Sequence, residues 1–241
     1  MARGKEMTEP GKIWGVGVGP GDPELLTLKA HRIITTADVV AYPAPNNGNS
    51  VARSIVADYL KDNQTEFAIR ISMDPAQFPP RDIYQRAADD IFAHSEEGRS
   101  VAVLCEGDPF FYGSFMYLFE RLAIRKSVEI VPGVSSMTAS AAALQIPLAS
   151  RNDVISVIPA TLDASEIKER LKTADMAIFI KVGRHLGKIK TILDEVGLFD
   201  KANYIERATM QAEKTSSLAD IVEDTAPYFS IIMAHRRGAA L

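Results

Sequence analysis

Cysteine is almost absent from this sequence, because Cys105 is the single cysteine among 241 residues. One thiol cannot form a disulfide within the chain, which favours a reducing compartment. Long apolar runs are lacking as well. The first ten residues, MARGKEMTEP, contain no apolar stretch, and no run approaches the roughly 18 apolar residues that a membrane helix needs. We therefore expect a cytoplasmic protein that does not enter a membrane.

An excess of basic residues is also missing, since the formal net charge is −4. Nucleic-acid-binding domains usually carry a basic stripe, and no tract here is rich in lysine or arginine. We therefore expect no nucleic-acid partner. The four histidines, His31, His94, His185 and His235, are scattered without metal-ligand spacing. We expect no bound metal ion, and a small molecule remains the favoured ligand.

Short apolar runs alternate with amphipathic stretches along the whole chain, which is typical of α/β architecture. The first half predicts strands at 12–18, 37–41, 67–73, 100–105 and 127–131. The second half predicts strands at 154–160, 175–182, 202–207 and 229–235. The first sheet is expected to be parallel or mostly parallel. The polar, irregular segment 208–228 indicates a mixed second sheet.

Two α/β domains with a ligand cleft between them are the expected arrangement. We place a flexible N-terminus at 1–11, an N-terminal domain at 12–123 and a C-terminal domain at 127–241. Asp22 and Pro23 predict the start of a helix after the first strand. Further helical faces follow Pro109 and run from Leu186.

Three glycine-containing turns stand out, each between a predicted strand and a predicted helix. They are GVGVGPGDP at 15–23, EGDPFFYGS at 106–114 and PGVSS at 132–136. Glycine permits close backbone approach. The carboxyl ends of neighbouring parallel strands are the usual ligand site of such sheets. One such turn is explained by packing alone, whereas three predict a sheet edge built for a ligand.

The first turn excludes two common phosphate sites. The dinucleotide fingerprint G-x-G-x-x-G fails, because its third glycine position is Pro20 or Asp22, depending on where counting starts. The Gly-Lys-Ser/Thr ending of a phosphate loop is absent as well. A proline and an aspartate remove a donor and add a negative charge where a phosphate would lie. We expect a ligand other than a phosphate.

As a set, these turns resemble the tetrapyrrole methylases, two-domain enzymes that methylate uroporphyrinogen III and the precorrins. The stretches GVGVGPGDPELLTLKA, EGDPFFYGS and PGVSS carry the resemblance, and IFIKVGRH, YIERAT and FSIIMAHR follow in family order. The stretch GDPFFYGSFMYL is similar to the branch that methylates C-20 of precorrin-2 or its cobalt-bearing counterpart. The resemblance implies S-adenosylmethionine as methyl donor, S-adenosylhomocysteine as product, a tetrapyrrole substrate and a homodimer.

Carried over by position, the resemblance implies a set of residues that contact S-adenosylmethionine. They are Pro20, Glu106, Gly107, Asp108, Phe111, Ser135, Ser136, Val182, Ala208 and Ala234. This chain departs from the family pattern, which often has glycine in place of Glu106, Ala208 and Ala234 and methionine in place of Val182. Contacts of this kind are largely made by the backbone, so the departures affect side-chain details most.

The substrate side is assigned from residue chemistry. Tyr112 follows the second turn directly, and it either packs or acts on the substrate as a proton acceptor or hydrogen-bond donor. A precorrin carries several carboxylates, for which arginine is well suited. Arg184, His185 and Arg207 follow predicted strands of the second domain and are the candidates. Cys105, inside an apolar strand, is expected to be a packed thiol.

Several alternatives stay open at the level of sequence. The nearest is C-20 methylation of a cobalt-containing substrate, or of another tetrapyrrole. A methyltransferase of the same fold that acts on ribosomal RNA or a protein is a second, and the acidic net charge argues against RNA. The third is a regulator that binds a nucleotide through the same glycine turns and transfers no methyl group.

Overall fold

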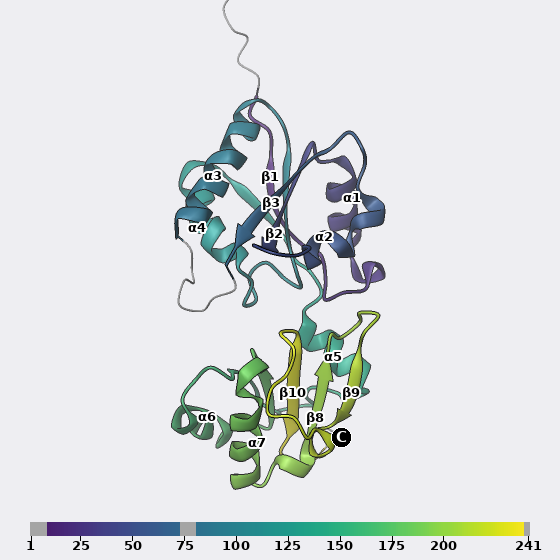
Figure 1. Ribbon diagram of the computed structural model, residues 1–241, viewed down its shortest axis with the longest axis vertical. Helices are drawn as coiled ribbons and strands as arrows, with labels where there is room; N and C mark the ends of the chain where they lie inside the picture. The colour runs from purple at the N-terminus through teal and green to yellow at the C-terminus, as the bar shows by residue number, and fades with distance from the viewer. Residues whose placement is uncertain (1–8, 73–80, 239–241) are drawn as a thin grey trace, which may run out of the picture. The chain divides into compact units, whose positions relative to one another are not determined.

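The computed structural model describes residues 9–72 and 81–238, and the chain divides into two compact units, Met1–Ser135 and Ser136–Leu241 (Figure 1). Most of the N-terminus predicted to be flexible, residues 1–8, lies outside the described residues. Each unit has its own sheet and its own core.

A parallel sheet of five strands forms the centre of the first unit, in the order β3-β2-β4-β1-β5. The strands are β1 (Ile13–Gly17), β2 (Val39–Pro45), β3 (Thr65–Ile71), β4 (Val101–Cys105) and β5 (Val128–Val131). The α-helices are α1 (Leu28–Thr36), α2 (Val51–Ile55), α3 (Arg81–Glu96) and α4 (Phe115–Arg125), and two short 3-10 helices are η1 (Pro23–Leu25) and η2 (Ala57–Tyr59).

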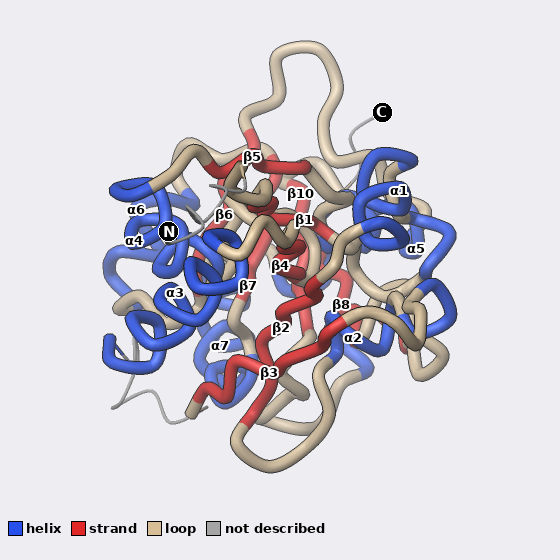
Figure 2. Tube along the Cα trace, turned by 90° about the horizontal axis from the view of Figure 1, so that it is seen from above, coloured by secondary structure: helices blue, strands red, loops and turns tan. Residues whose placement is uncertain are grey.

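The central strand β4 is buried on both faces, as its sequence VAVLC requires. Val101, Val103 and Cys105 pack in the core beneath α3 and α4, whereas Ala102 and Leu104 pack in the core beneath α1 and α2. Successive side chains of a strand point to opposite faces, and strands of a parallel sheet covered on both sides read as continuous apolar runs. Figure 2 shows α3 and α4 on one side of these strands and α1 and α2 on the other.

The second unit has a mixed sheet in the order β6-β7-β10-β8-β9. Its strands are β6 (Ile155–Pro159), β7 (Met176–Ile180), β8 (Ala202–Glu206), β9 (Lys214–Ser217) and β10 (Ser230–His235). Only the β6–β7 pair is parallel among the described strands of this sheet. The helices are α5 (Ser136–Leu144), α6 (Ala164–Leu171) and α7 (Leu186–Glu195), with η4 (Gly183–His185), η5 (Phe199–Lys201) and η6 (Leu218–Asp220). α6 and α7 cover one face, and α5 packs on the other (Figure 1).

The predicted fold class, a parallel first sheet and a mixed second sheet, is confirmed. Each predicted strand is present within a few residues of its expected ends. The segment 208–228 nevertheless contains a strand that the sequence analysis missed. This strand, β9, has the sequence KTSS and lies at the edge of the sheet, so it has no apolar run by which to recognise it.

Two boundaries differ from those expected. Asp22 caps only η1, and α1 begins at Leu28 after Thr27, whose hydroxyl accepts a hydrogen bond from the Ala30 amide at 3.1 Å. The division between units falls after Ser135 and not at 123–127. The physical reason is that β5 pairs with β1 along its whole length and therefore belongs to the first sheet.

None of the helices in the described part of the chain is both long enough and apolar enough to cross a membrane.

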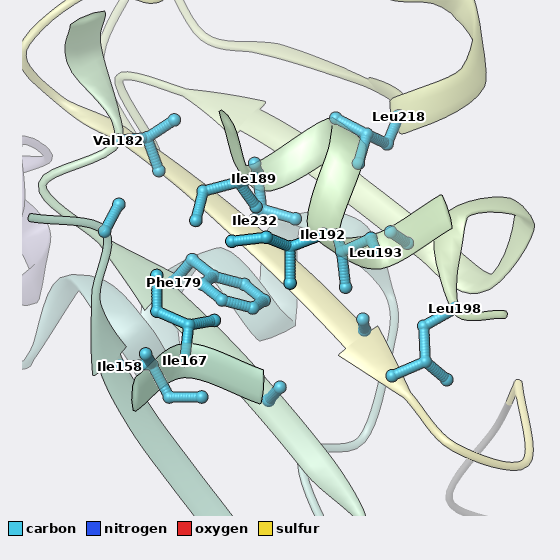
Figure 3. Packing of buried hydrophobic residues seen from close by; sticks show 14 of the residues in the cluster. Ile158, Ile167, Phe179, Val182, Ile189, Ile192, Leu193, Leu198, Leu218 and Ile232 are labelled. Carbon is cyan, nitrogen blue, oxygen red and sulfur yellow. The ribbon is translucent and has the colours of Figure 1, made fainter. Parts of the chain in front are cut away.

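Phe179 is the largest side chain of β7 and is fully buried against α6 and α7, among Ile158, Ile167, Ile189 and Ile232 (Figure 3). We expect Phe179→Ala to lower the free energy of unfolding by about 3–5 kcal/mol, because it opens a cavity in this core. Urea denaturation measures the change. The matched control is Val222→Ala at a side chain that is 86% exposed, which should change stability by less than about 0.5 kcal/mol. Equal stabilities of the two variants would contradict the packing described.

Candidate active site at the carboxyl edge of the first sheet

The turns after β1 and β4 are joined by backbone hydrogen bonds beyond the ends of the strands. The Gly107 amide donates to the Gly19 carbonyl at 2.7 Å, and the Gly19 amide donates to the Gly107 carbonyl at 3.3 Å. The Val18 amide donates to the Cys105 carbonyl at 2.9 Å. Since β1 lies between β4 and β5, all three glycine-containing turns leave the same edge of the sheet.

Gly17 and Gly133 are needed because the turns touch backbone to backbone. A Cβ atom on Gly17 would lie 2.6 Å from both the Gly107 carbonyl oxygen and the Gly133 nitrogen. A Cβ atom on Gly133 would lie 2.1 Å from the same carbonyl oxygen. Side chains at these positions would therefore push the turns apart. These two glycines let the turns pack directly against one another. Because glycine has no side chain, the turns expose peptide backbone at these positions.

Asp108 holds the second and third turns together. One carboxylate oxygen, Oδ1, accepts from the Phe110 amide at 2.9 Å, and the other, Oδ2, accepts from the Gly133 amide at 3.0 Å. Both oxygens therefore have backbone partners. The carboxylate therefore holds the two turns in place. The sequence analysis did not predict this role, because Gly133 is 25 residues from Asp108 in the chain.

Glu106, the first residue after β4, points to the opposite side of the strand from Cys105. Its Oε1 accepts from the Ala52 amide, at the start of α2, at 3.1 Å. Loss of hydration raises the pKa of this carboxyl above its ordinary value, and hydrogen bonds from the backbone of Glu106 and Ala52 only partly oppose the shift. The result is a poorly hydrated acid at the ligand edge.

Cys105 is a packed thiol, as expected. It is 2% exposed, in the core beneath α3 and α4. Burial, and then the negative charge of Glu106, raise its pKa to about 12. A thiol of this kind remains protonated and is a poor nucleophile at neutral pH.

Tyr112 lies at the far end of the second turn, with a backbone φ of 55°. Left-handed backbone is unusual for an aromatic residue and is concentrated at functional sites. The side chain is 45% exposed, and its ring meets that of Phe111 edge-on, with centroids 5.2 Å apart. The neighbouring Phe110 instead packs on Phe119 of α4. The Tyr112 ring therefore contacts Phe111, whereas Phe110 contacts the aromatic side chains of α4.

The remaining candidates of this unit lie along the same edge. Pro20 is buried in the first turn, and Ser135 ends the third turn and the unit. Ser136 opens α5 and belongs to the second unit.

In the second unit, most candidates gather where β7 and β8 end. Arg184 and His185 form η4 just after β7, and Arg207 directly follows β8. Both ends lie beside the start of β10. Phe179 of β7 pairs with Ile232 of β10, so Ile180 lies one residue further along β7, and Glu206 of β8 pairs with Ser230 of β10. Burial and then the charges of Lys188 and Arg184 lower the pKa of His185. Arg207 donates to Glu206 at 3.1 Å.

Three residues at this second edge have left-handed backbone without being glycine. They are Lys181, Arg207 and Thr209, with φ of 57°, 50° and 67°. Such positions are not readable from sequence, and the sequence analysis missed Lys181 and Thr209. Val182 is fully buried and Ala208 is 9% exposed, so neither side chain is open to solvent.

Ala234 is not brought to this edge. It pairs with Ala177 and Ala202, near the opposite ends of β7 and β8, and is 1% exposed in the core. Ala234 is the fourth residue after Ser230 in β10, so at about 3.3 Å per residue their Cα atoms are roughly 13 Å apart. The assignment was carried over by position from the family resemblance, and the antiparallel direction of β10 places Ala234 at the other end of this sheet from Val182 and Ala208.

Residues 12–221 match the family model of the Tetrapyrrole (Corrin/Porphyrin) Methylases. Among curated proteins, the chain is 42% identical over 235 residues to the cobalamin biosynthesis protein CobIJ of Mycobacterium tuberculosis, covering 94% of this chain. The match spans only 46% of that protein, about half its length. The chain is also 41% identical over 231 residues to the precorrin-2 C(20)-methyltransferase of a Sinorhizobium species, covering 92% of this chain and 94% of the relative.

Two further comparisons concern a relative named for a cobalt-bearing substrate and a solved structure of similar fold. The cobalt-precorrin-2 C(20)-methyltransferase of Salmonella typhimurium is 31% identical over 230 residues, covering 94% of this chain and 97% of the relative. The crystal structure of uroporphyrin-III C-methyl transferase from Thermus thermophilus, complexed with S-adenyl homocysteine, superposes with a TM-score of 0.70. It is 23% identical and covers 93% of this chain and 92% of that one, a likeness of fold.

Replacing Asp108 tests the joint between the second and third turns. We expect Asp108→Ala to lower the free energy of unfolding by about 1.5–3 kcal/mol, because two backbone amides lose a charged acceptor. Asp108→Asn keeps one acceptor oxygen and should lose less. Urea denaturation compares both with Asp89→Asn, an exposed carboxylate on α3, which should change stability by less than about 0.5 kcal/mol. A stability of Asp108→Ala equal to that of the wild type would mean that the Asp108 carboxylate does not hold the second and third turns together.

Proposed function

This chain belongs to the tetrapyrrole methylase family, and we propose that it transfers a methyl group from S-adenosylmethionine to C-20 of precorrin-2, giving precorrin-3A in cobalamin biosynthesis. The observation that carries the proposal is the 41% identity to a precorrin-2 C(20)-methyltransferase over nearly the full length of both chains. The matched half of the mycobacterial CobIJ protein, named for cobalamin biosynthesis, supports it.

The chemistry of the first edge fits S-adenosylmethionine better than it fits a phosphate ligand. The edge presents the backbone of three turns and two acidic side chains, Glu106 and Asp108, which suit a cation that also carries hydroxyl groups. We propose that Pro20, Gly107, Phe111 and Ser135 complete the contacts of this unit, and that Ser136, Val182 and Ala208 contribute from the second unit.

When bound, S-adenosylmethionine supplies an activated methyl group on a positively charged sulfur. The protein therefore has to align this methyl group with the nucleophilic carbon, and alignment alone can supply a large part of the rate enhancement. The turns suit this task because glycine contacts and the Asp108 carboxylate hold them in place. Strong stabilisation of the positive charge would slow the reaction, since that charge is lost in the transition state.

Basic residues of the second unit are proposed to bind the carboxylates of the substrate. Arg184 and Arg207 carry full charge, and the guanidinium group matches a carboxylate with two parallel hydrogen bonds. His185 has a lowered pKa, so at neutral pH it serves as a neutral hydrogen-bond donor. Glu206 positions Arg207, and the hydroxyl of Tyr204 donates to Glu206 at 2.8 Å.

A cobalt-bearing precorrin-2 is the second candidate substrate, because a cobalt-precorrin-2 C(20)-methyltransferase also matches along its full length. The lower identity of that relative, 31% against 41%, favours the metal-free substrate. We also infer a homodimer, from the family resemblance, and a cytoplasmic location, which the single buried thiol of Cys105 supports.

Incubation with precorrin-2 and labelled S-adenosylmethionine tests the proposal. The expected product carries the label and gains the mass of one methyl group that replaces one hydrogen, at C-20 by nuclear magnetic resonance. The same experiment with cobalt-precorrin-2 should give slower turnover. Binding of S-adenosylhomocysteine without methyl transfer to either substrate would refute the enzyme and favour a regulator.

Tyr112 is proposed to contact the substrate through its hydroxyl. We expect Tyr112→Phe to lower the single-turnover rate at saturating S-adenosylmethionine by roughly tenfold to a thousandfold, the range of lost polar contacts in a transition state. The affinity for S-adenosylhomocysteine, measured by calorimetry, should stay the same. Tyr228→Phe, at a side chain 70% exposed in the second unit, is the control. A wild-type rate for Tyr112→Phe would mean that the residue only packs.

A further inference from the structure

The strand β3 forms one edge of the first sheet, where only β2 pairs with it among the described strands. Figure 2 shows it at the end of the row of strands that begins at β5. The other edge strands of the described chain are β5, β6 and β9, and all three are shorter than β3, which has seven residues. A long edge strand is a surface on which a further strand can pair.

The backbone groups of β3 that point away from the sheet can be identified. The Thr65 amide donates to the Asp38 carbonyl, just before β2, at 2.9 Å, so the backbone groups of Thr65 point toward β2. Backbone N–H and C=O groups alternate in direction along a strand, and Glu66, Ala68 and Arg70 therefore point theirs outward. Within residues 9–72 and 81–238, no hydrogen bond is described for the amides of these three residues.

The sequence of β3, TEFAIRI, does not protect this edge. Natural edge strands are commonly protected by lysine, proline, a bulge or a short length. β3 contains neither lysine nor proline, and it pairs with β2 in unbroken register from Thr65 to Ile71. The edge strand β9 of the second sheet, in contrast, is short and polar, with a lysine in KTSS. The edge of β3 is therefore suited to accept another strand.

The outward positions of β3 complement themselves when two copies of the strand run antiparallel. Pairing centred on Ala68, the middle residue, gives every residue from Thr65 to Ile71 a partner on the other copy. In this register Glu66 lies opposite the partner's Arg70, and Arg70 lies opposite the partner's Glu66. Opposite charges directly across an antiparallel pair are favourable. A register shifted by two residues would lose both charge pairs.

We propose that two copies of this chain associate through their β3 strands, antiparallel and centred on Ala68, and so join two first sheets into one. The two-fold axis passes through Ala68, and the outward amides of Glu66, Ala68 and Arg70 each donate to a carbonyl of the partner. The inference rests on the homodimer in the proposed function and assigns a surface to it. It does not depend on the reaction that the protein catalyses.

The two faces of β3 leave room for a partner strand. Ile69 and Ile71 are buried in the core beneath α3 and α4, whereas Glu66 and Arg70 lie on the opposite face and are exposed. On the α3 side, an open groove of about 410 Å³ lies beside the strand. It is lined by Thr65, Phe67 and Ala68 of β3 and by Asp90, Ala93 and His94 of α3. The helix therefore does not close over the strand edge at Ala68.

Both charged side chains are already held in place at the edge. Glu66 accepts two hydrogen bonds from Arg53, at 2.8 and 3.0 Å, and Arg70 donates to the carbonyls of Pro45 and Gly48 at 2.9 and 3.0 Å. A carboxylate can accept a second guanidinium, and a guanidinium has further N–H groups to donate. Side chains fixed in this way lose less conformational entropy when they pair.

The first test replaces the central amide. Light scattering at micromolar concentration should give the wild type a mass near twice the 26.3 kDa of one chain and Ala68→Pro a mass near that of one chain. The Ala68 amide points outward, and proline is tolerated at such positions of an edge strand. Ala68→Ser, which keeps the amide, is the matched control and should remain a dimer. A folded Ala68→Pro that is still a dimer would overturn the inference.

The second test exchanges the charges. We expect Arg70→Glu and Glu66→Arg each to raise the dissociation constant of the dimer by roughly tenfold to a hundredfold, because like charges then lie opposite one another. The double variant restores opposite charges and should associate within about threefold of the wild type. Analytical ultracentrifugation over a concentration series measures the constants. Damage to the monomer would instead accumulate, so a double variant weaker than either single variant would overturn the register.

The third test locates the two-fold axis. Cys105 is buried, so Ala68→Cys introduces a single accessible thiol. Its Cα atom should lie about 5.5 Å from its counterpart in a hydrogen-bonded antiparallel pair, and a short bis-maleimide should link the two chains. Ile124→Cys, 84% exposed on α4, which packs near β5 at the other edge, should not be linked. A dimer that is not linked through Ala68→Cys would contradict the proposed pairing.

The outcomes separate this inference from the proposed function. A wild-type protein that is a monomer contradicts both the β3 surface and the homodimer, and leaves methyl transfer to be judged by its own assay. A wild-type dimer that Ala68→Pro and the charge variants do not weaken overturns the β3 surface alone. If circular dichroism shows that Ala68→Pro is unfolded, the charge exchange and the cross-link decide.

Discussion

The contact among three stretches of bare backbone, at Gly17, Gly107 and Gly133, is the constraint on which the site depends. It joins the ends of β1, β4 and β5 more closely than side chains would allow. Parallel pairing aligns these strand ends at one edge, and the Asp108 carboxylate then holds the second turn to the third. Glu106 and Tyr112 both belong to the second turn, which these contacts hold in place.

The two edges differ in the charge that they offer. The first presents carboxylates and carbonyls from turns that leave parallel strands, whereas the second presents Lys181, Arg184 and Arg207 from the ends of β7 and β8. An acidic edge suits a sulfonium donor, and a basic edge suits a ring that carries carboxylates. The acidic net charge of the whole chain does not reveal this division, whereas the strand register places the basic residues of the second unit at one edge of its sheet.

Much of the fold could be predicted from sequence, because the buried strands of both sheets are continuous apolar runs such as VAVLC at 101–105. The strand β9 could not, since an edge strand of sequence KTSS needs no apolar residues. The three turns were identified by their glycines. The partners of Asp108 and Glu106 were not, because Gly133 and Ala52 are distant in sequence. The place of Ala234 in its sheet could not be predicted either, because a match of sequence motifs does not reveal strand direction.

The place of β10 in the second sheet has a consequence for synthesis on the ribosome. The first sheet needs only residues up to Val131, so that unit can fold while the rest of the chain is still being made. β10 lies between β7 and β8, although it follows every other strand of its sheet in the sequence. Until residues 230–235 emerge, β7 and β8 have no common neighbour and keep unpaired backbone. The nascent second unit therefore cannot complete its sheet until residues 230–235 have left the ribosome, and until then chaperones can reach its unpaired strands.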